Sequence, residues 1–497
     1  MTHYVDALGL VFQFGVLLAI AAGTLLGLIM GALPGLTAAM AIALLLPLTF
    51  GMPAVMGVGM LLGTLCGAIA GGSVSATLLN IPGTPSSVAT TLDAFPMARN
   101  GQAGRALGIA IVSSFAGGII SAVLLSLLAP PIAEFALRFG PAEYFALSVF
   151  GLVIIASVSS KSLLKGLIAG LIGLFIATVG SDPITGVNRF TFGEMSLLTG
   201  VSLLPALIGL FAVAQILKDI VDYVSSSNKG SMVQNPGEAR PRWLEVLRSW
   251  KVVASSSVIG TIVGAIPGAG GSIASFLSYD QAKRMSKTPK KFGTGHPEGI
   301  VASESSNNAL VGGALIPMLT LGVPGEAATA VLMGGLMIQG IRPGPTLFAE
   351  QGAIIYGIFI AFFIANIFML LIQWFGIRLF IKVLQVPRKL LMSLILVFCF
   401  IGVYGVDGNI FDIYLMLGFG VLGYFLSKYD FGTAPVILGL ILGGIAESNL
   451  RRGLQVFGGD WTPFVMRPIS AAFLIGALLF LGYALWQNVK DKQGVNA

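Results

Sequence analysis

The chain has 497 residues, of which 56% are hydrophobic and only 10% are charged, and its formal net charge is +7. Soluble domains carry about 25% charged residues, so this composition excludes a water-soluble fold and predicts a polytopic helical membrane protein. Its apolar runs are long enough for membrane-spanning helices, whereas a transmembrane β-barrel would show short alternating segments. The positive charge does not indicate nucleic-acid binding, because the Lys and Arg residues lie in short loops, where they set membrane topology.

The first half of the chain alternates apolar runs with glycine- and proline-rich breaks. Residues 8–30 are apolar and end at GALPG, residues 31–35, after which a second run leads to Phe50. Residues 54–79 are apolar and end at NIPGTPSS, residues 80–87. The polar segment from Asp93 to Arg105 is predicted to be a surface loop. Four more apolar runs follow, near residues 106–129, 142–158, 163–180 and 198–220.

A polar and basic segment, residues 222–251, is predicted to be a cytoplasmic linker between two halves. An apolar run then leads into GAIPG, residues 264–268, and a basic loop follows, in which His296 is expected to be solvated. The next stretch, ASESSNNALVGGALIPMLTLGVPGEAAT, covers residues 302–329. The last apolar runs lie near residues 353–377, 391–404, 411–426, 432–447 and 468–486.

The two halves share small landmarks in the same order. GALPG at residue 31 recurs as GAIPG at residue 264, an offset of 233 residues. The pairs Gly71-Gly72 and Pro82-Gly83 recur as Gly312-Gly313 and Pro324-Gly325, at offsets of 241 and 242 residues. This recurrence predicts an internal repeat, with chance recurrence in a glycine-rich chain as the alternative. The predicted organisation is a first repeat, a linker, a second repeat, and an additional C-terminal helix and tail, at residues 1–221, 222–251, 252–467 and 468–497.

The distribution of basic residues orients the chain, because Lys and Arg are enriched in cytoplasmic loops. Counting spans back from the basic linker places Lys165 and Arg99 inside and the N-terminus in the periplasm. Counting back from the basic C-terminus places Lys428 inside. The segment that ends at Arg99 then crosses inward, and its repeat, which ends at Arg342, crosses outward.

The predicted fold is therefore all-α, with two inverted-topology repeats, helices broken by glycine and proline, and about 10–12 membrane spans. Residues 252–279 have basic flanks on both sides and a central break, which favours a re-entrant hairpin; residues 8–50 would form its partner. The pair Arg451-Arg452 conflicts with the count, which places it outside; a position lining an aqueous cavity is the alternative.

The broken segments predict a binding site. Proline removes a backbone donor and glycine relaxes the backbone, so a break leaves free N–H groups on one side and free carbonyls on the other. Free N–H groups at a helix N-terminus bind carboxylates, and free carbonyls bind sodium. Two such segments in matching places of two halves indicate a secondary transporter.

The substrate-binding candidates are polar or break residues: Asn80, Gly83, Thr84, Ser86, Ser87, Asn307, Asn308, Pro324 and Gly325. The cation-binding candidates are Ser73, Ser303, Glu304 and Thr320. Close helix packing is the alternative explanation for the small residues. A solvated position at the edge of a loop is the alternative for Glu304 and Glu326.

Four stretches carry a resemblance to a known family: GALPG; NIPGTPSSVATTLDAFPMARNGQAGRALG; GAIPGAGGSIASFLSYDQAKR; and HPEGIVASESSNNALVGGALIPMLTLGVPG. In these the chain resembles the large membrane subunit of the tripartite tricarboxylate transporters, the TctA family, over nearly its whole length. The resemblance implies a bacterial inner-membrane carrier that works with a small four-helix membrane subunit and a periplasmic solute-binding protein. It also implies uptake of citrate or related carboxylates, driven by a sodium or proton gradient.

The chain has no phosphate-binding GxxxxGK[ST] loop, which agrees with transport that is not driven by ATP. We therefore expect a permease subunit that is not an enzyme, with no cofactor beyond its coupling ion and with its C-terminus in the cytoplasm. The first alternative is a stand-alone ion-coupled organic-anion carrier, and an ion channel is another. An intramembrane hydrolase would need a histidine base, but the chain has only His3 and His296, neither within an apolar run.

Overall fold

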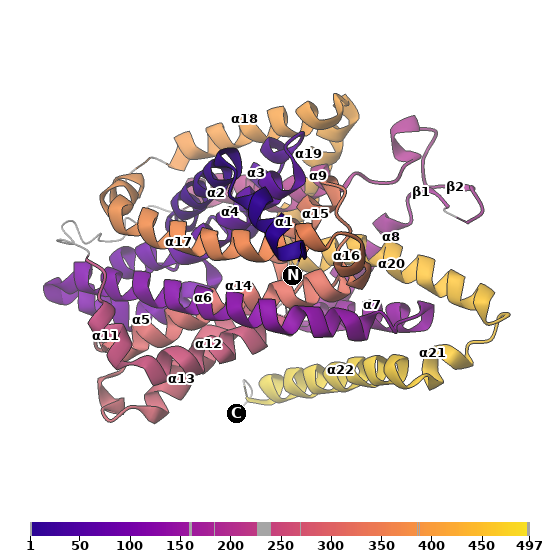
Figure 1. Ribbon diagram of the computed structural model, residues 1–497. Helices are drawn as coiled ribbons and strands as arrows, with labels where there is room; N and C mark the ends of the chain where they lie inside the picture. The colour runs from indigo at the N-terminus through magenta and orange to yellow at the C-terminus, as the bar shows by residue number, and fades with distance from the viewer. Residues whose placement is uncertain are drawn as a thin grey trace. The chain divides into compact units, whose positions relative to one another are not determined.

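A computed structural model describes residues 2–158, 162–182, 184–225, 240–268, 270–384, 386 and 388–494, and this part of the chain is almost entirely helical (Figure 1). Its seven candidate membrane spans, judged by length and hydropathy, are Phe14–Ala32, Ala54–Leu79, Pro85–Ala136, Leu203–Val221, Gly352–Phe380, Leu390–Asp407 and Ile410–Lys428. The prediction of an all-α polytopic membrane protein is confirmed. The number of spans stays a prediction, because further apolar helices are shorter than one span.

The described chain forms two compact units. Unit one comprises Met1–Ala133, Asp219–Ile266 and Gly270–Val406. From its first segment it takes α1 (Thr2–Val11), α2 (Phe14–Ala32), α3 (Ala38–Leu45), α4 (Ala54–Leu79), the 3-10 helix η2 (Pro85–Ser87), α5 (Val88–Met97) and most of α6 (Ala103–Ala136). Its later segments supply α11 (Trp243–Arg248), α12 (Trp250–Ala265), α13 (Gly270–Met285), α14 (Pro297–Leu321), α15 (Ala327–Ile338), α16 (Pro345–Glu350), α17 (Gly352–Val383) and α18 (Arg388–Asp407).

Unit two comprises Glu134–Lys218, Pro267–Ala269 and Asp407–Ala497. Its elements are α7 (Pro141–Val158), α8 (Leu163–Ala177), the strands β1 (Gly180–Ser181) and β2 (Asn188–Arg189), α9 (Leu203–Leu207), the first part of α10 (Ala214–Ser225), α19 (Ile410–Lys428), α20 (Ala434–Val456), α21 (Thr462–Met466) and α22 (Pro468–Gly494). The strands form a two-stranded antiparallel hairpin. Much of the predicted linker, residues 226–239, lies outside the described residues.

Glycines fix the packing of α2 against α4 in unit one. Gly27 and Gly31 lie four residues apart, and a Cβ added to either would collide with the backbone carbonyl of Thr64 or Ala68. Small residues at this spacing let two helix backbones touch, which is how helices pack in membranes where the hydrophobic effect is weak.

The pair α12 and α14 repeats this packing in the same register. Gly260 approaches the backbone of Ser306, and Gly264 approaches that of Leu310. Gly260 and Gly264 on α12 lie 233 residues after Gly27 and Gly31 on α2. Ser306 and Leu310 on α14 lie 242 residues after Thr64 and Ala68 on α4, as in the sequence repeat. The recurring glycines therefore serve the same helix contact in both places.

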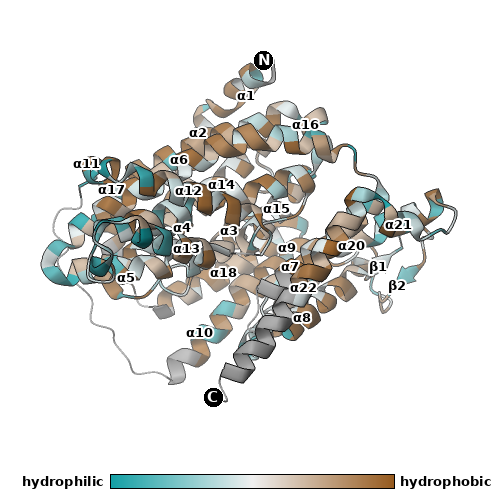
Figure 2. Cartoon of the chain, turned by 90° about the horizontal axis from the view of Figure 1, so that it is seen from below, coloured by the Kyte–Doolittle hydropathy of each residue, from teal (hydrophilic) through white to brown (hydrophobic). Residues whose placement is uncertain are grey.

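The predicted surface loop from Asp93 to Arg105 is wrong for its first part. The chain stays helical to Met97, turns through a short π-helical segment at Ala98–Gln102, and continues as α6. The Asp93 side chain is fully buried, whereas residues 99–102 are exposed. Figure 2 shows hydrophilic residues gathered around α11 and the end of α13, while apolar residues predominate along the other helices of the unit.

The prediction that His296 is solvated is also wrong. Its side chain is only 14% exposed and its ring stacks on Phe292 with 4.8 Å between the ring centroids. His296 precedes α14, and its Nδ1 accepts a hydrogen bond from the Glu298 N–H at 3.2 Å. It therefore caps the N-terminus of this helix.

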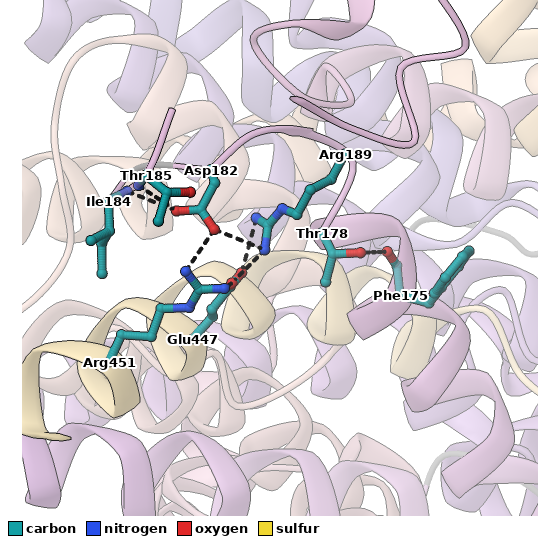
Figure 3. Close-up of polar contacts among 8 residues, drawn as sticks. All are labelled: Phe175, Thr178, Asp182, Ile184, Thr185, Arg189, Glu447 and Arg451. Carbon is teal, nitrogen blue, oxygen red and sulfur yellow. Dashed lines mark hydrogen bonds and ion pairs between the residues drawn. The ribbon is translucent and has the colours of Figure 1, made fainter. Parts of the chain in front are cut away.

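In unit two, α20 is joined to the β1–β2 hairpin by ion pairs. Arg189 pairs with Glu447 at 2.6 Å, and Arg451 pairs with Asp182 at 2.6 Å and with Glu447 at 2.9 Å (Figure 3). The backbone N–H groups of Thr185 and Ile184, together with Arg451, hold the pKa of Asp182 well below its usual range. The charges of the two arginines are thus balanced by two carboxylates.

Candidate functional site

The first break in a helix, residues 80–87, lies between α4 and α5 in unit one. Asn80 ends α4 in the left-handed conformation, with φ of 57°, and is exposed. The Ser87 hydroxyl accepts a hydrogen bond from the Thr84 N–H at 3.3 Å and donates one to the Thr84 carbonyl at 2.8 Å. The hydroxyls of Thr84 and Ser86 lie 3.1 Å apart. The predicted hydroxyl donors of this break therefore serve first as caps of the following helix.

The second break, residues 322–326, repeats this arrangement between α14 and α15. Gly322 ends α14 in the left-handed conformation, with φ of 71°. The Thr329 hydroxyl accepts a hydrogen bond from the Glu326 N–H at 3.0 Å and donates one to the Glu326 carbonyl at 2.9 Å. Glu326 and Thr329 follow Thr84 and Ser87 at an offset of 242 residues, so the caps occupy matching positions.

Helix α13 closes over the first break. The Ser272 hydroxyl donates a hydrogen bond to the Pro85 carbonyl at 2.7 Å, and the Ser275 hydroxyl donates one to the Ser86 carbonyl at 2.7 Å. A segment of the second predicted repeat thus satisfies backbone carbonyls of the first. Ser272 and Ser275 were not among the predicted site residues.

The structure places Asn307 and Asn308 away from the second break. Both lie inside the continuous helix α14, where Asn307 Nδ2 donates to the Ile69 carbonyl of α4 at 3.5 Å. Asn308 lies 14 residues before Gly322, which is about 21 Å along a helix that rises 1.5 Å per residue. The expectation that these amides lie beside a break is wrong, because the polar run is itself helical. Pro324 and Gly325 lie in the break and are buried.

The four cation-binding candidates do not form one cluster. Thr320 donates to the Ile316 carbonyl at 2.7 Å and lies 16 residues from Glu304 on the same helix, or about 24 Å. Ser73, on α4, donates to the Ala70 carbonyl at 2.7 Å and lies 3.3 Å from Gln373 Nε2. The residues that remain adjacent are Ser303 and Glu304.

Glu304 lies inside α14, fully buried, which excludes the solvated alternative. Its Oε1 is 2.5 Å from the Thr90 hydroxyl of α5, and its Oε2 is 2.8 Å from the Ser114 hydroxyl of α6. One carboxyl group therefore joins three helices, including the helix that follows the first break. Thr90 and Ser114 are not predicted from the sequence, because each lies outside the break motifs and their only signal is a hydroxyl in an apolar helix.

Asp93 makes a second connection between distant segments. Its Oδ1 accepts hydrogen bonds from the backbone N–H groups of Gly293, Gly295 and His296, at 2.9, 2.8 and 2.7 Å. Its Oδ2 accepts one from the Tyr279 hydroxyl at 2.8 Å. This carboxylate fastens α5 to α13 and to the loop before α14.

The repeated breaks agree with a match over most of the chain, because residues 17–438 fit the sequence profile of the tripartite tricarboxylate transporter TctA family. The chain belongs to the TctA family. It is 39% identical over 474 residues, 95% of this chain and 93% of the relative, to a protein of Agrobacterium vitis described as an uncharacterised 52.8 kDa protein in the TAR-I ttuC′ 3′ region. It is 38% identical over 234 residues, 47% of this chain and 97% of the relative, to an uncharacterised protein in the TAR-II ttuC′ 3′ region of the same species. No solved structure matches the chain.

Membership of the TctA family identifies the chain as a membrane component of a tripartite transporter. The described residues contain no group of three or more His, Cys, Asp or Glu side chains able to hold a metal ion. Their distinctive polar features are the two capped breaks and the buried carboxyl groups Glu304 and Asp93.

Proposed function

We propose that the chain is the permease subunit of a binding-protein-dependent secondary transporter that imports a di- or tricarboxylate of the citrate type. A sodium or proton gradient drives uptake by alternating access. The protein works in the bacterial inner membrane with a small four-helix membrane subunit and a periplasmic solute-binding protein.

The observation that carries this proposal is the pair of matching breaks. Each break consists of a left-handed helix end, a proline-glycine turn and a helix start capped by a hydroxyl group, at equivalent positions of the two predicted repeats. Discontinuous helices at equivalent places in two repeats are typical of secondary transporters, whose inverted repeats enclose a midplane site.

The chemistry of the breaks suits a carboxylate. Because the hydroxyls of Ser87 and Thr329 are engaged in capping, the substrate donors would be the free backbone N–H groups at the starts of the following helices, assisted by Asn80. Many neutral donors bind an anion without a fixed positive charge that would retain it.

The proposed topology can place Arg451 outside even though basic residues are enriched in cytoplasmic loops. Counting from the linker places the β1–β2 hairpin outside, and Arg451 pairs with Asp182 of this hairpin, so both lie on the same side. A second contact, at the other end of α8, agrees with this topology. Lys165, which the count from the linker places inside, donates to the carbonyl of Tyr429 at 2.8 Å, and the neighbouring Lys428 is placed inside by the count from the C-terminus. Arg451 is tolerated outside because two carboxylates balance it and Arg189.

Uptake into proteoliposomes tests the function. The chain and the small subunit are reconstituted, a sodium or proton gradient is imposed, and labelled citrate and succinate are supplied with or without the cognate binding protein. Uptake that needs both the gradient and the binding protein is the expected result. Uptake without the binding protein would favour the stand-alone carrier, and no gradient-driven uptake would refute both.

An asparagine variant tests the site within this assay. Asn80→Ala is expected to reduce uptake at least about tenfold while membrane insertion stays normal, because a lost donor costs about 1.4 kcal/mol or more. Asn100→Ala, at an exposed turn, is the matched control. Normal uptake by the Asn80→Ala variant would refute the assignment of this residue to the site.

A further inference from the structure

The hydroxyl groups around Glu304 form a chain of short contacts that ends on a backbone carbonyl. The Thr90 hydroxyl lies 2.5 Å from Glu304 Oε1 and 3.1 Å from the Ser303 hydroxyl. The Ser303 hydroxyl in turn donates one proton that the Gly299 and Ile300 carbonyls of its own helix share, at 2.9 and 3.2 Å. All three side chains of this relay, Glu304, Thr90 and Ser303, are fully buried.

Counting protons along the relay indicates the charge of Glu304. Each hydroxyl carries one proton, and the Gly299 and Ile300 carbonyls share that of Ser303 as one hydrogen bond. An ionised Glu304 therefore leaves no proton for one of the two contacts of Thr90, with Glu304 and with Ser303. A protonated Glu304 supplies the third proton: Oε1–H donates to Thr90, Thr90 donates to Ser303, and Ser303 donates to the Gly299 carbonyl. The Ser114 hydroxyl donates to Oε2 in either case.

The surroundings of Glu304 supply no compensating cation. In the described part of the chain its side-chain hydrogen-bond partners are Thr90, Ser114 and Asn307, and no ion pair includes it. Within unit one, the charged groups on α14 and on the helices packed around it, apart from Glu304, are Asp93, Arg105, Glu245, Arg248, Lys251, Asp280, Lys283, Arg284, Glu298 and Glu350. Several of these have other partners, since Asp93 binds the loop before α14, Arg105 pairs with Glu245, and Arg284 pairs with Asp280.

The position of Glu304 also argues against a sodium ion held with it by the break at the end of its own helix. Carbonyl groups freed by this second break lie in the last turn of α14, which begins at Met318, 14 residues or about 21 Å away. Around Glu304 the helix is continuous, and the Ser303 hydroxyl is engaged with a carbonyl of its own helix. Hydroxyls can both donate and accept, so this environment can exchange a proton with little rearrangement.

We propose that Glu304 is the proton-carrying group of the transporter and that Thr90, Ser303 and Ser114 position its carboxyl. This inference rests on the proposed function and assigns a proton as a coupling ion. In the closed arrangement, with Thr90 against Oε1, Glu304 is neutral. When water enters the contact between Thr90 and Glu304, it takes the proton from Oε1 and leaves a carboxylate, and reprotonation is required before the water can leave again, because burying an unpaired carboxylate is costly.

The protonation state can be tested without any substrate. Infrared spectra of the purified chain in lipid, recorded while the pH is stepped from 5 to 9, contain a carbonyl band from each protonated carboxylic acid. The expected result is a band at pH 7 that is present in the wild type and in Glu298→Gln, but absent in Glu304→Gln. Glu298 lies on the same helix with a side chain 29% exposed, and is the matched control. An ionised Glu304 throughout this pH range would overturn the proposal.

Whether Glu304 couples proton movement to substrate uptake is tested by measuring transport. In proteoliposomes with a pH-sensitive dye inside and the binding protein outside, labelled citrate or succinate uptake should bring protons inward. Glu304→Gln should lose gradient-driven accumulation at least tenfold yet keep substrate exchange within about twofold. Full proton-coupled accumulation by this variant would overturn the coupling role. Absence of all transport in the wild type, with the infrared band intact, would refute the proposed function and leave only the protonation of Glu304.

Discussion

Two buried carboxyl groups, Asp93 and Glu304, form hydrogen bonds that involve the short helix α5, but their hydrogen-bond partners are of different kinds. Asp93, on α5, faces three backbone N–H groups and a tyrosine hydroxyl, whereas Glu304, on α14, faces hydroxyls and an amide that reach it from α5, α6 and its own helix. Thr90 and Asp93 are three residues apart and therefore lie on the same side of α5. Both carboxyl groups join α5 to the segment that contains α14.

The two sites differ in whether the groups that donate hydrogen bonds to the carboxyl can also accept them. A backbone N–H can only donate, so the site of Asp93 suits an ionised carboxylate and offers nothing to a proton on Oδ1. A hydroxyl can reverse its role, so the site of Glu304 accommodates both the acid and the carboxylate. We infer that Asp93 is a permanent fastener and that Glu304 is a group able to change its charge during transport.

Removal of the Asp93 carboxylate should have the largest effect on stability. Asp93→Ala leaves the buried Tyr279 hydroxyl and three part-buried N–H groups without their acceptor, at up to about 1–3 kcal/mol for each group that water does not satisfy. We expect a loss of more than about 3 kcal/mol, measured as a fall of several degrees in the thermal unfolding temperature in detergent.

The control for this change is Asp280→Ala, which removes an exposed carboxylate that pairs with Arg284 at 2.8 Å. Surface ion pairs contribute about 0–1 kcal/mol, so the unfolding temperature should barely move. Equal effects of the two substitutions would show that Asp93 does not fasten α5.

Amide substitutions compare the two carboxyl groups directly. Asp93→Asn keeps an oxygen for the N–H groups but removes the charge that strengthens these bonds, and should cost about 1–3 kcal/mol. Glu304→Gln keeps the shape of a neutral acid and should cost less than about 1 kcal/mol. Thermal unfolding of the two variants side by side measures the difference, and a larger loss for Glu304→Gln would reverse our assignment of fixed and changeable charge.

The sequence predicted the breaks and their repetition, but it could not predict these carboxyl contacts. The recurring glycines could be recognised from short stretches of sequence, because Gly31 and Gly264 each lie against the backbone of the partner helix wherever this helix pair forms. Asp93 looked like a loop residue because its acceptor role depends on N–H groups 200 residues later in the chain. The polar run that contains Asn307 looked like part of a break, yet it stays helical, and the side-chain amides of Asn307 and Asn308 donate to carbonyls of α4 and α14.

The predicted repeats and the compact units divide the chain differently. Unit one contains both breaks and takes segments from both predicted repeats. Helix α13 of the second repeat closes on the first break, and α3 of the first repeat packs against α15, which follows the second break. A constant sequence offset can indicate a duplication. It cannot show that each predicted repeat supplies a helix beside the break of the other, because this depends on contacts between them.

The Thr90 hydroxyl should matter less for stability than Asp93 and more for transport. Thr90→Val preserves the shape of the side chain and removes the link between Glu304 and Ser303, at about 1–2 kcal/mol. Gradient-driven uptake should fall at least tenfold, whereas Thr90→Ser should retain it. The matched control is Thr91→Val, since the Thr91 hydroxyl donates to the Val88 carbonyl of its own helix, at 2.7 Å. Equal uptake by the Thr90→Val and Thr91→Val variants would remove Thr90 from the relay.

Among the changes to the partners of Asp93, loss of the Tyr279 hydroxyl, which can both donate and accept, should have a small effect on stability and on transport. Tyr279→Phe removes a single hydroxyl and leaves Oδ1 with its three N–H donors, so the cost should be about 1 kcal/mol, a shift of a few degrees at most in the unfolding temperature. Tyr279 also packs edge-on against Phe292 at 5.3 Å, and phenylalanine keeps this contact. The backbone donors alone should hold the carboxylate, and transport should stay within about twofold of the wild type. A loss as large as that of Asp93→Ala would mean that the tyrosine hydroxyl, and not the row of N–H groups, fastens α5, which would remove the contrast between the two carboxyl sites.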